Sequence, residues 1–369
     1  MNKIRLLLSI LILISVSESS RAAAPSLREM AASMLMVGFK GDSITPDNPV
    51  VSYLRDTRVG GIILFDVDLT GSRELGSRNI TSRRQLASLT RQLRDIAGYP
   101  LLIAADQEGG RVQRLKPHYG YSPLPSAREI GAMNCADSTL AVARLMADEL
   151  AEAGVNVNLA PELDIHCDSC PVIGRLNRAY SDNPETVAFH ARITIDELHR
   201  RGIAVAVKHF PGHGSATSDS HYGLTDVTST WNEKELIPFK RMIDSGRADM
   251  IMTAHIFNRN IDADLPATLS PATLTGLLRE KLGFEGVILT DDIYMQGIID
   301  NYSAPDAVIK AILAGADMLI MGNNITTGFE SDRPAKTVDI IVDAVEKGII
   351  PRERIEESYR RISRLASRF

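Results

Sequence analysis

Eight short apolar runs, separated by intervals long enough for a helix, constrain the fold of this chain more than any other feature. Each run is almost continuously apolar rather than alternating, which is typical of strands covered on both faces in a parallel sheet. The runs cover residues 34–39, 60–65, 100–105, 155–160, 203–207, 248–254, 286–290 and 316–322.

Helical patterns occupy the intervals. Residues 137–153 carry apolar side chains at helical spacing and end before Gly154, where a C-terminal cap is expected. Asn183-Pro184 predicts the start of another helix, with Gly202 just beyond its end.

Two further helices are predicted nearer the C-terminus. Thr230 and Glu233 form a capping-box pattern ahead of a helix that runs through Lys240. Residues 351–369 have the pattern of a last amphipathic helix.

Strand and helix therefore alternate eight times. This alternation predicts an α/β protein built as a single (β/α)₈ TIM barrel, and 369 residues are ample for one. An open, doubly wound sheet is the structural alternative, but eight regular repeats favour closure.

Polar clusters follow several apolar runs directly, where a barrel would place its active site. Residues 106–114 (DQEGGRVQR) follow the third run and residues 208–214 (KHFPGHG) follow the fifth. Residues 254–258 (AHIFN) and 291–295 (DDIYM) follow the next two. A purely structural protein has no reason to place polar residues there so consistently, so the pattern indicates an enzyme.

The N-terminus has the pattern of a secretory signal. Lys3 and Arg5 precede a short apolar stretch at 6–16, and small residues follow at Ser20 and at positions 22–24. We therefore predict a signal peptide over residues 1–24, a barrel over 25–369, and an exported bacterial protein, periplasmic or secreted. An uncleaved anchor is the alternative, but the stretch is too short for stable membrane insertion. A formal net charge of −5 without a basic run argues against nucleic acid as a partner.

The chain has three cysteines. In an oxidising compartment Cys167 and Cys170 can form a disulfide that pins a loop. Cys135 is expected to be buried as a small apolar residue.

Three ordered motifs carry a resemblance to a known family. They are residues 106–115 (DQEGGRVQRL), the KHFPGHG loop with its later Asp-Ser-His, and residues 283–295 (GFEGVILTDDIYM). From about Ser26 to the C-terminus the chain resembles glycoside hydrolase family 3, in its single-domain β-N-acetylglucosaminidase branch. The resemblance implies no metal and no cofactor. Many members carry a second domain that supplies an acid residue, and we expect this chain to lack it because the last helix ends at Phe369.

Asp291 and Asp292 are the candidate nucleophiles. A retaining glycosidase needs one carboxylate to attack the anomeric carbon and one acid to protonate the leaving oxygen. Periodicity does not decide which aspartate faces the sugar, and a capping role fits Asp292. The resemblance implies that Asp291 is the nucleophile and Asp292 a supporting group.

The expected acid is a histidine. His221 can exchange a proton near neutral pH, and Asp219, two residues earlier, can orient its ring. The resemblance implies that His221 is the general acid/base and Asp219 its partner. A solvated loop histidine is the simpler alternative. We interpret the glycines around His213 as a hinge and His213 itself as structural.

The resemblance also implies the groups that bind the sugar. Glu108 is expected either to contact the substrate or to pair with Arg111, and His255 either to touch the substrate or to pack. The implied binding residues are Asp106, Arg114, Arg178, Lys208 and His209.

The sequence thus predicts a retaining exo-β-N-acetylglucosaminidase acting on peptidoglycan fragments or chitooligosaccharides through a glycosyl–Asp291 intermediate. Phosphorolysis by the same site is an alternative within this chemistry. A zinc-dependent hydrolase using His209, His213, Asp219 and His221 is another, and an exported sugar-binding protein without catalysis is a third.

Overall fold

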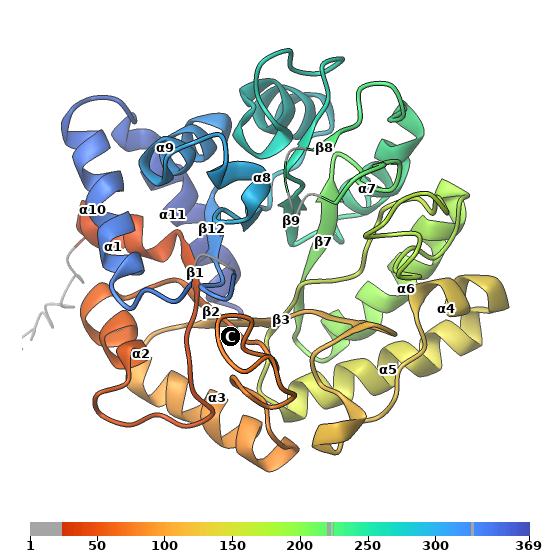
Figure 1. Ribbon diagram of the computed structural model, residues 1–369, viewed down its shortest axis with the longest axis horizontal. Helices are drawn as coiled ribbons and strands as arrows, with labels where there is room; N and C mark the ends of the chain where they lie inside the picture. Colours follow the sequence, from red (N-terminus) through yellow and green to blue (C-terminus); the bar gives the residue numbers. More distant parts are fainter. Residues whose placement is uncertain (1–23, 220–222, 224, 326–327) are drawn as a thin grey trace, which may run out of the picture.

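The computed structural model describes residues 24–219, 223, 225–325 and 328–369. Eight parallel strands form a closed barrel in the order β1-β12-β11-β9-β7-β6-β3-β2, and β1 pairs with both β2 and β12 (Figure 1). The strands are β1 (Leu35–Gly38), β2 (Gly61–Ile63), β3 (Leu102–Ala105), β6 (Val157–Asn158), β7 (Ala204–Phe210), β9 (Met250–Thr253), β11 (Val287–Asp292) and β12 (Met318–Met321). All eight predicted strands and the closed barrel are confirmed, and the open sheet is excluded.

Helices surround the barrel and cover the outer face of its strands (Figure 1). A π-helical segment, Ala272–Lys281, lies between β9 and β11 in the chain. The α-helices are α1 (Leu27–Ser33), α2 (Pro49–Ser52), α3 (Arg83–Ala97), α4 (Ala127–Met133), α5 (Ala136–Glu152), α6 (Pro184–Arg200), α7 (Leu236–Asp244), α8 (Gln296–Ile299), α9 (Ala304–Ala314), α10 (Arg333–Glu346) and α11 (Arg352–Ala366).

All four predicted helices are confirmed, as α5, α6, α7 and α11. The backbone beyond α5 turns left-handed at Gly154, with φ of 72°, as the predicted cap requires. The Asn183 side chain accepts a hydrogen bond from the Glu185 N–H and so caps α6.

The predicted capping box of Thr230 and Glu233 is wrong. The Thr230 hydroxyl donates to the Val227 carbonyl, so it holds the preceding turn instead of starting a helix. Asn232 caps a single 3₁₀ turn at Glu233–Glu235, and α7 begins only after that turn.

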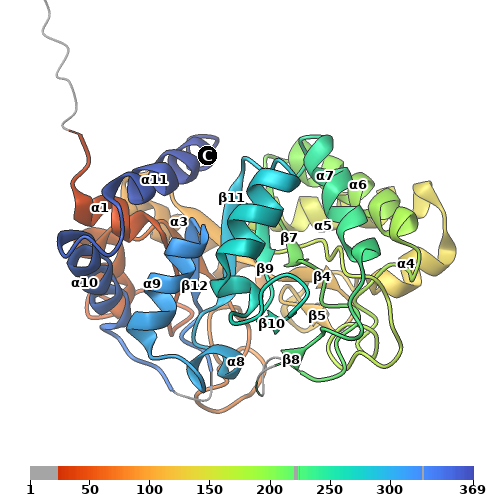
Figure 2. The same cartoon turned by 90° about the horizontal axis from the view of Figure 1, so that it is seen from above.

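Apart from Asp291 in β11, the barrel strands are buried, which explains their continuous apolar pattern. β7 and β11 are the longest barrel strands, and near their carboxyl ends they carry Lys208 and His209, and Asp291 and Asp292, respectively. Two small sheets lie in the loops at the carboxyl ends: β4 (Gln107–Gly109) pairs with β5 (Val112–Gln113), and β8 (Thr225–Asp226) with β10 (Ile256–Phe257). Figure 2 shows α8, β8 and β10 at one end of the barrel and the C-terminus at the other.

The predicted signal peptide lies outside the described residues apart from Ala24, so it remains a prediction. Across the described ranges, no helix combines the length and apolar content needed to span a bilayer. The three cysteines are free thiols. Cys170 is buried as expected of a structural residue, whereas Cys135 is only partly buried because it stands at the exposed start of α5. The prediction of a buried Cys135 is therefore wrong.

Candidate active site

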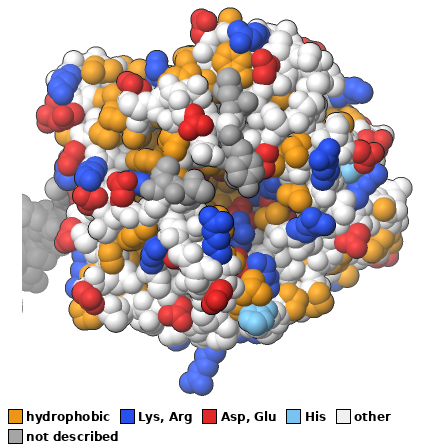
Figure 3. All heavy atoms as spheres, viewed as in Figure 1, with side chains coloured by type: hydrophobic (Ala, Val, Ile, Leu, Met, Phe, Trp, Pro, Cys, Tyr) orange, Lys and Arg blue, Asp and Glu red, His pale blue; other side chains and the backbone are white. Residues whose placement is uncertain are grey.

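A cavity opens at the carboxyl ends of the barrel strands. This face is turned toward the viewer in Figure 1, and Figure 3 shows it hollowed near its centre. The cavity has a volume of about 300 Å³, at the lower end for ligand pockets in proteins. Its apolar lining includes Ile63, Met252 and Ile320, from three barrel strands. The predicted site residues that line it are Asp106, Arg114, Arg178, Lys208, His209 and Asp291.

Asp106, directly after β3, contacts two cations. Its Oδ1 accepts a hydrogen bond from Lys208 Nζ at 2.8 Å, and its Oδ2 accepts one from Arg114 Nη2 at 3.1 Å. Burial on its own would raise the pKa of Asp106, but the charges of Lys208 and Arg114 hold that pKa well below its ordinary value. The carboxylate is therefore ionised at neutral pH and fixed in orientation.

Lys208 connects Asp106 to a second charged cluster. Only 2% of its side chain is exposed, and its Nζ lies 2.7 Å from Glu108 Oε1. Glu108 accepts hydrogen bonds from Nε and Nη2 of Arg178, each at 2.9 Å, and Arg178 also contacts Glu162. A two-pronged contact of this kind fixes the plane of a guanidinium. The position of Arg178 at the cavity is therefore set by the barrel and not by a ligand.

The expected pairing of Glu108 with Arg111 is wrong. Arg111 is exposed at the turn between β4 and β5, whereas Glu108 is buried on β4. Burial raises the pKa of Glu108, but the charges of Arg178 and Lys208 outweigh it and lower the pKa to about 2. Glu108 supports Arg178 and Lys208 from behind the cavity, and it is not among the residues that line it.

Glu162, Asp164 and His209 lie close enough together to share one metal ion. Each of them already has a partner, because Arg178 contacts Glu162 and Asp164 Oδ2 lies 2.7 Å from His209 Nδ1. Asp164 also accepts hydrogen bonds from the backbone N–H of His209 at 3.2 Å and of His213 at 2.6 Å. The contacts of Asp164 fix the ring of His209 at the cavity.

The two aspartates that end β11 have different surroundings. Asp291 is partly exposed, and its Oδ1 accepts a hydrogen bond from the Asp292 N–H at 2.7 Å. Asp292 is buried, and its two carboxylate oxygens accept hydrogen bonds from the N–H groups of Tyr294 and Gly322, each at 3.0 Å. Burial, with a smaller contribution from Asp291, raises the pKa of Asp292 to about 6. Asp292 holds the turn that follows, while Asp291 is the more accessible carboxylate.

His255 packs behind this turn. It is buried, its Nδ1 lies 2.8 Å from the Thr268 hydroxyl, and its Nε2 lies 2.9 Å from the Asp292 carbonyl oxygen. Of the two roles expected for His255, the packing role is the one that these contacts support.

The glycines after β7 do not form a hinge, so that interpretation is wrong. Residues 203–214 are all buried. A Cβ on Gly212 would lie 2.5 Å from the Cβ of Glu235, and one on Gly214 would lie 1.9 Å from the Ile165 carbonyl oxygen. Both glycines are therefore required for close packing, and the turn that they form is fixed.

Asp219 is partly exposed beyond this turn, and it is not among the residues that line the cavity. His221 lies outside the described residues. The predicted pairing of Asp219 with His221, and the placement of that pair near Asp291, remain predictions.

Sequence reasoning did not single out Glu162 and Asp164, which anchor Arg178 and His209. Both residues follow the fourth apolar run by a few positions, so the pattern that identified Asp106 was available for them too. It also missed Asn324, which lines the cavity and whose Oδ1 accepts a hydrogen bond from the fully buried Arg78 at 2.9 Å. Nothing in the local sequence around Arg78 indicates that long-range contact.

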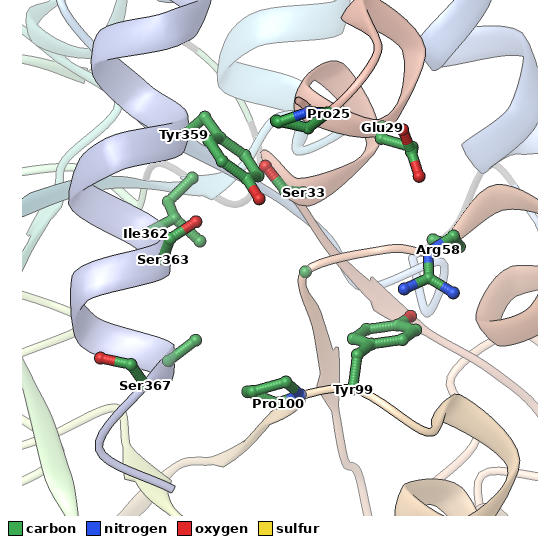
Figure 4. A pocket seen from close by; sticks show the side chains of 12 residues that line it. Pro25, Glu29, Ser33, Arg58, Tyr99, Pro100, Tyr359, Ile362, Ser363 and Ser367 are labelled. Carbon is green, nitrogen blue, oxygen red and sulfur yellow. The ribbon is translucent and has the colours of Figure 1, made fainter. Parts of the chain in front are cut away.

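A second cavity, shown in Figure 4, lies between α1, α11 and the segments that precede β2 and β3. Arg58 stacks over the Tyr99 ring at 4.5 Å there, and the Tyr99 hydroxyl donates to the Val59 carbonyl at 2.9 Å. The amino ends of barrel strands generally serve stability, whereas catalysis is located at the carboxyl ends. Of the predicted site residues that the structure describes, none lines this second cavity.

The fold and the site together define the class: a (β/α)₈-barrel enzyme whose polar side chains, from several strand ends, converge on one small cavity. The model for the glycosyl hydrolase family 3 N-terminal domain matches residues 26–365. The chain belongs to glycosyl hydrolase family 3, and it is a glycoside hydrolase, as the sequence motifs predict.

Known relatives agree with this assignment. The chain is 37% identical over 297 residues to a beta-hexosaminidase of Xylella fastidiosa, a match that covers 78% of this chain and 83% of the relative. The solved beta-N-acetylhexosaminidase of Beutenbergia cavernae is similar with a TM-score of 0.82 at 28% identity, and the match covers 94% of this chain and 99% of that one.

A larger relative matches over part of its length. The family 3 beta-N-acetylglucosaminidase of a Paenibacillus species is similar with a TM-score of 0.84 at 34% identity. The match covers 94% of this chain but only 63% of the Paenibacillus chain. The likeness therefore extends over a little less than two thirds of that protein's chain.

Proposed function

We propose that this protein is a retaining exo-β-N-acetylhexosaminidase that releases non-reducing terminal β-GlcNAc from peptidoglycan fragments or chitooligosaccharides. The observation that carries the proposal is the position of Asp291, an accessible carboxylate at the end of β11 in a small cavity lined by fixed polar groups. The similarity to enzymes named as hexosaminidases supports the choice of sugar.

The proposed binding groups suit one terminal sugar. Asp106 accepts from hydroxyl groups, while Arg114, Arg178, Lys208 and His209 donate to hydroxyl or amide oxygens. The contacts that these side chains make with one another hold them in place before substrate binds, so little ordering entropy is lost on binding. The cavity volume of about 300 Å³ favours a single residue at the chain end over an internal segment of a long glycan.

The proposed chemistry has two steps. In the first, an Asp291 carboxylate oxygen attacks the anomeric carbon, the glycosidic bond breaks, and His221 gives its proton to the leaving oxygen. In the second, His221 takes a proton from water, the resulting hydroxide attacks the anomeric carbon, and the ester to Asp291 breaks. Two inversions leave the released sugar in the β configuration. Asp219 is proposed to orient the His221 ring and to stabilise its protonated form.

We further propose that the protein is exported, to the periplasm or the medium, on the basis of the basic, apolar and small-residue pattern of residues 1–24. In that location the available substrates are glycans outside the cytoplasm. Export predicts a mature protein that begins near residue 25, which N-terminal sequencing of the protein from culture fractions would check.

The test of the reaction is the configuration of the first product. Hydrolysis of 4-nitrophenyl β-N-acetylglucosaminide, followed by proton NMR, should show β-GlcNAc before the α anomer appears by mutarotation. First formation of the α anomer would exclude a covalent Asp291 intermediate. Turnover of other β-glycosides in preference to the N-acetylhexosaminides would exclude the proposed substrate class.

A further inference from the structure

The buried turn after β7 is held from two sides by carboxylates. On one side, Asp164 accepts hydrogen bonds from the backbone N–H groups of His209 and His213. On the other side, Glu235 Oε1 accepts a hydrogen bond from the Ser215 hydroxyl at 2.6 Å. The turn lies directly before the segment that carries Asp219.

The 3₁₀ turn that contains Glu235 is fitted closely against this segment. The Trp231 Nε1 donates to the Pro211 carbonyl oxygen at 3.0 Å. The Cα of Gly212, where φ is 120°, approaches the Glu235 side chain so closely that a Cβ would lie 2.6 Å from Glu235 Oε2. Glycine at position 212 is thus a condition for the contact between Glu235 and the turn.

The two carboxylates differ in their partners. Asp164 Oδ2 lies 2.7 Å from Nδ1 of the His209 ring. Glu235 is 2% exposed, and its Oε2 has no hydrogen-bond partner among the residues that the structure describes. Burying a carboxyl group in this way is costly, and a neutral side chain would fill the same space at less cost. Burial raises the pKa of Glu235 to about 7, and the nearby charge of Asp164 raises it further.

We propose that Glu235 is a positioning residue that fixes the turn Gly212–Ser215 and thereby the direction in which the segment carrying Asp219 leaves the barrel. This inference rests on the proposed function, in which that segment carries the proton donor. A displacement of about 1 Å in a catalytic group is enough to lower a rate severely. Glu235 touches neither the cavity nor the reacting atoms, so its effect is indirect.

The proposal assigns the loss to one step of the reaction. Protonation of the leaving oxygen matters most for poor leaving groups and least for activated aryl groups. A misplaced donor segment therefore slows a disaccharide more than an aryl glycoside that carries the same GlcNAc. By contrast, substitution of a residue that merely stabilises the fold lowers the rate equally on both substrates.

Ionisation of Glu235 provides a second signature. The groups that face it are Asp164, with its partner His209, and His213 on the turn itself. The pKa of Asp164 lies below its ordinary value, because burial is outweighed by the charge and hydrogen bond of His209, and burial lowers the pKa of His213 to about 4. Asp164 and His213 therefore keep their charge states near neutral pH, whereas Glu235 changes its own. Ionised Glu235 accepts more strongly from the turn, so the advantage of the wild type over Glu235→Gln should grow as pH rises through about 7.

The experiment compares Glu235→Gln with Glu233→Gln, a matched control two residues away whose side chain is 81% exposed. The substrates are diacetylchitobiose and 4-nitrophenyl β-N-acetylglucosaminide, assayed between pH 5.5 and 8.5. In Glu235→Gln, kcat/KM should fall by about tenfold for chitobiose and by about twofold or less for the aryl glycoside. Both values should be unchanged in Glu233→Gln.

Ser215→Ala, which removes the hydroxyl donor to Glu235, should reproduce the same selective loss to a smaller degree. It also carries the test if Glu235→Gln does not fold. Equal losses on the two substrates, no loss on either, or a wild-type advantage that does not change with pH would overturn the role of Glu235. A wild-type protein that turns over neither substrate would instead overturn the proposed function, so the two failures are distinct.

Discussion

The carboxylates that follow β3 and those that end β11 lie at opposite positions in the barrel ring and have opposite electrostatic surroundings. β3 and β11 are four positions apart in the ring of eight strands. After β3, Asp106 contacts two cations, and its pKa is held well below its ordinary value. At the end of β11, Asp292 accepts hydrogen bonds from the backbone N–H groups of Tyr294 and Gly322, and its pKa is raised to about 6.

This difference in electrostatic surroundings distinguishes a carboxylate suited to binding a sugar from one suited to reacting with it. A carboxylate that is neutralised by buried cations is a stable acceptor for hydroxyl groups but a poor nucleophile, because its electrons are already engaged. A carboxylate that lies next to a second acid and lines the cavity is better suited to react, and this is the role that we propose for Asp291. Four predictions, in order of decreasing effect, test this contrast.

Asp291→Ala should remove the proposed nucleophile and lower kcat for an aryl β-GlcNAc by about a thousandfold or more. Asp291 is partly exposed, so the fold should survive, and circular dichroism should show an unchanged barrel. Activity within tenfold of the wild type would mean that another carboxylate reacts.

Lys208→Met should keep the volume of the side chain but leave Asp106 and Glu108 without a cation that both contact. Breaking a buried ion pair costs about 3–5 kcal/mol of stability, and kcat/KM should also fall, by about a hundredfold. Lys240→Met is the control, because Lys240 forms an exposed pair with Asp244 and should contribute less than about 1 kcal/mol. Urea denaturation measures the free energy of unfolding of both variants. Similar losses of stability in Lys208→Met and Lys240→Met would contradict the buried network of charges.

Arg178→Lys should keep the charge but lose the two-pronged contact with Glu108. The remaining cation would be less firmly oriented, so KM for the aryl substrate should rise by about tenfold with a smaller change in kcat. A fall in kcat alone would assign Arg178 to the chemical step instead of to binding.

Asp292→Asn should change the pH dependence of stability more than activity. A carboxyl whose pKa is raised from 3.8 to about 6 on folding stabilises the folded state fully below pH 3.8, and this contribution is lost as pH rises through 6. Between pH 5 and 7.5 the wild type should therefore lose about 1 kcal/mol relative to Asp292→Asn. Urea denaturation at both pH values gives this difference, and a constant gap would show that Asp292 is ionised throughout.

Much of the fold was predictable from local pattern. Each barrel strand is covered on both faces, so its sequence is continuously apolar, and the eight runs therefore predict the eight strands. The helix that starts at Asn183-Pro184 was predictable because its cap is local. The capping box at Thr230 failed because the Val227 carbonyl takes up the Thr230 hydroxyl within a turn that the pattern does not reveal.

The residues of the candidate site could be predicted from the sequence. The pairing of their charged side chains with one another could not. Asp106, Lys208 and Asp291 follow apolar runs, and the topology of a barrel brings such positions to one end. The pairing of Glu108 with Arg178 joins residues 70 positions apart. Local reasoning gave Glu108 its nearest cation, Arg111, and that choice was wrong.

The chain itself therefore determines the barrel and the family, because apolar periodicity and ordered motifs are local properties of sequence. The tertiary structure alone decides which charges neutralise one another, since that depends on which strand ends meet around the ring. It also decides the role of the glycines after β7. In the sequence, Gly212 and Gly214 suggest conformational freedom of the backbone. In the fold, Glu235 and the Ile165 carbonyl occupy the space that a side chain at these positions would need. The same two glycines therefore make the turn rigid.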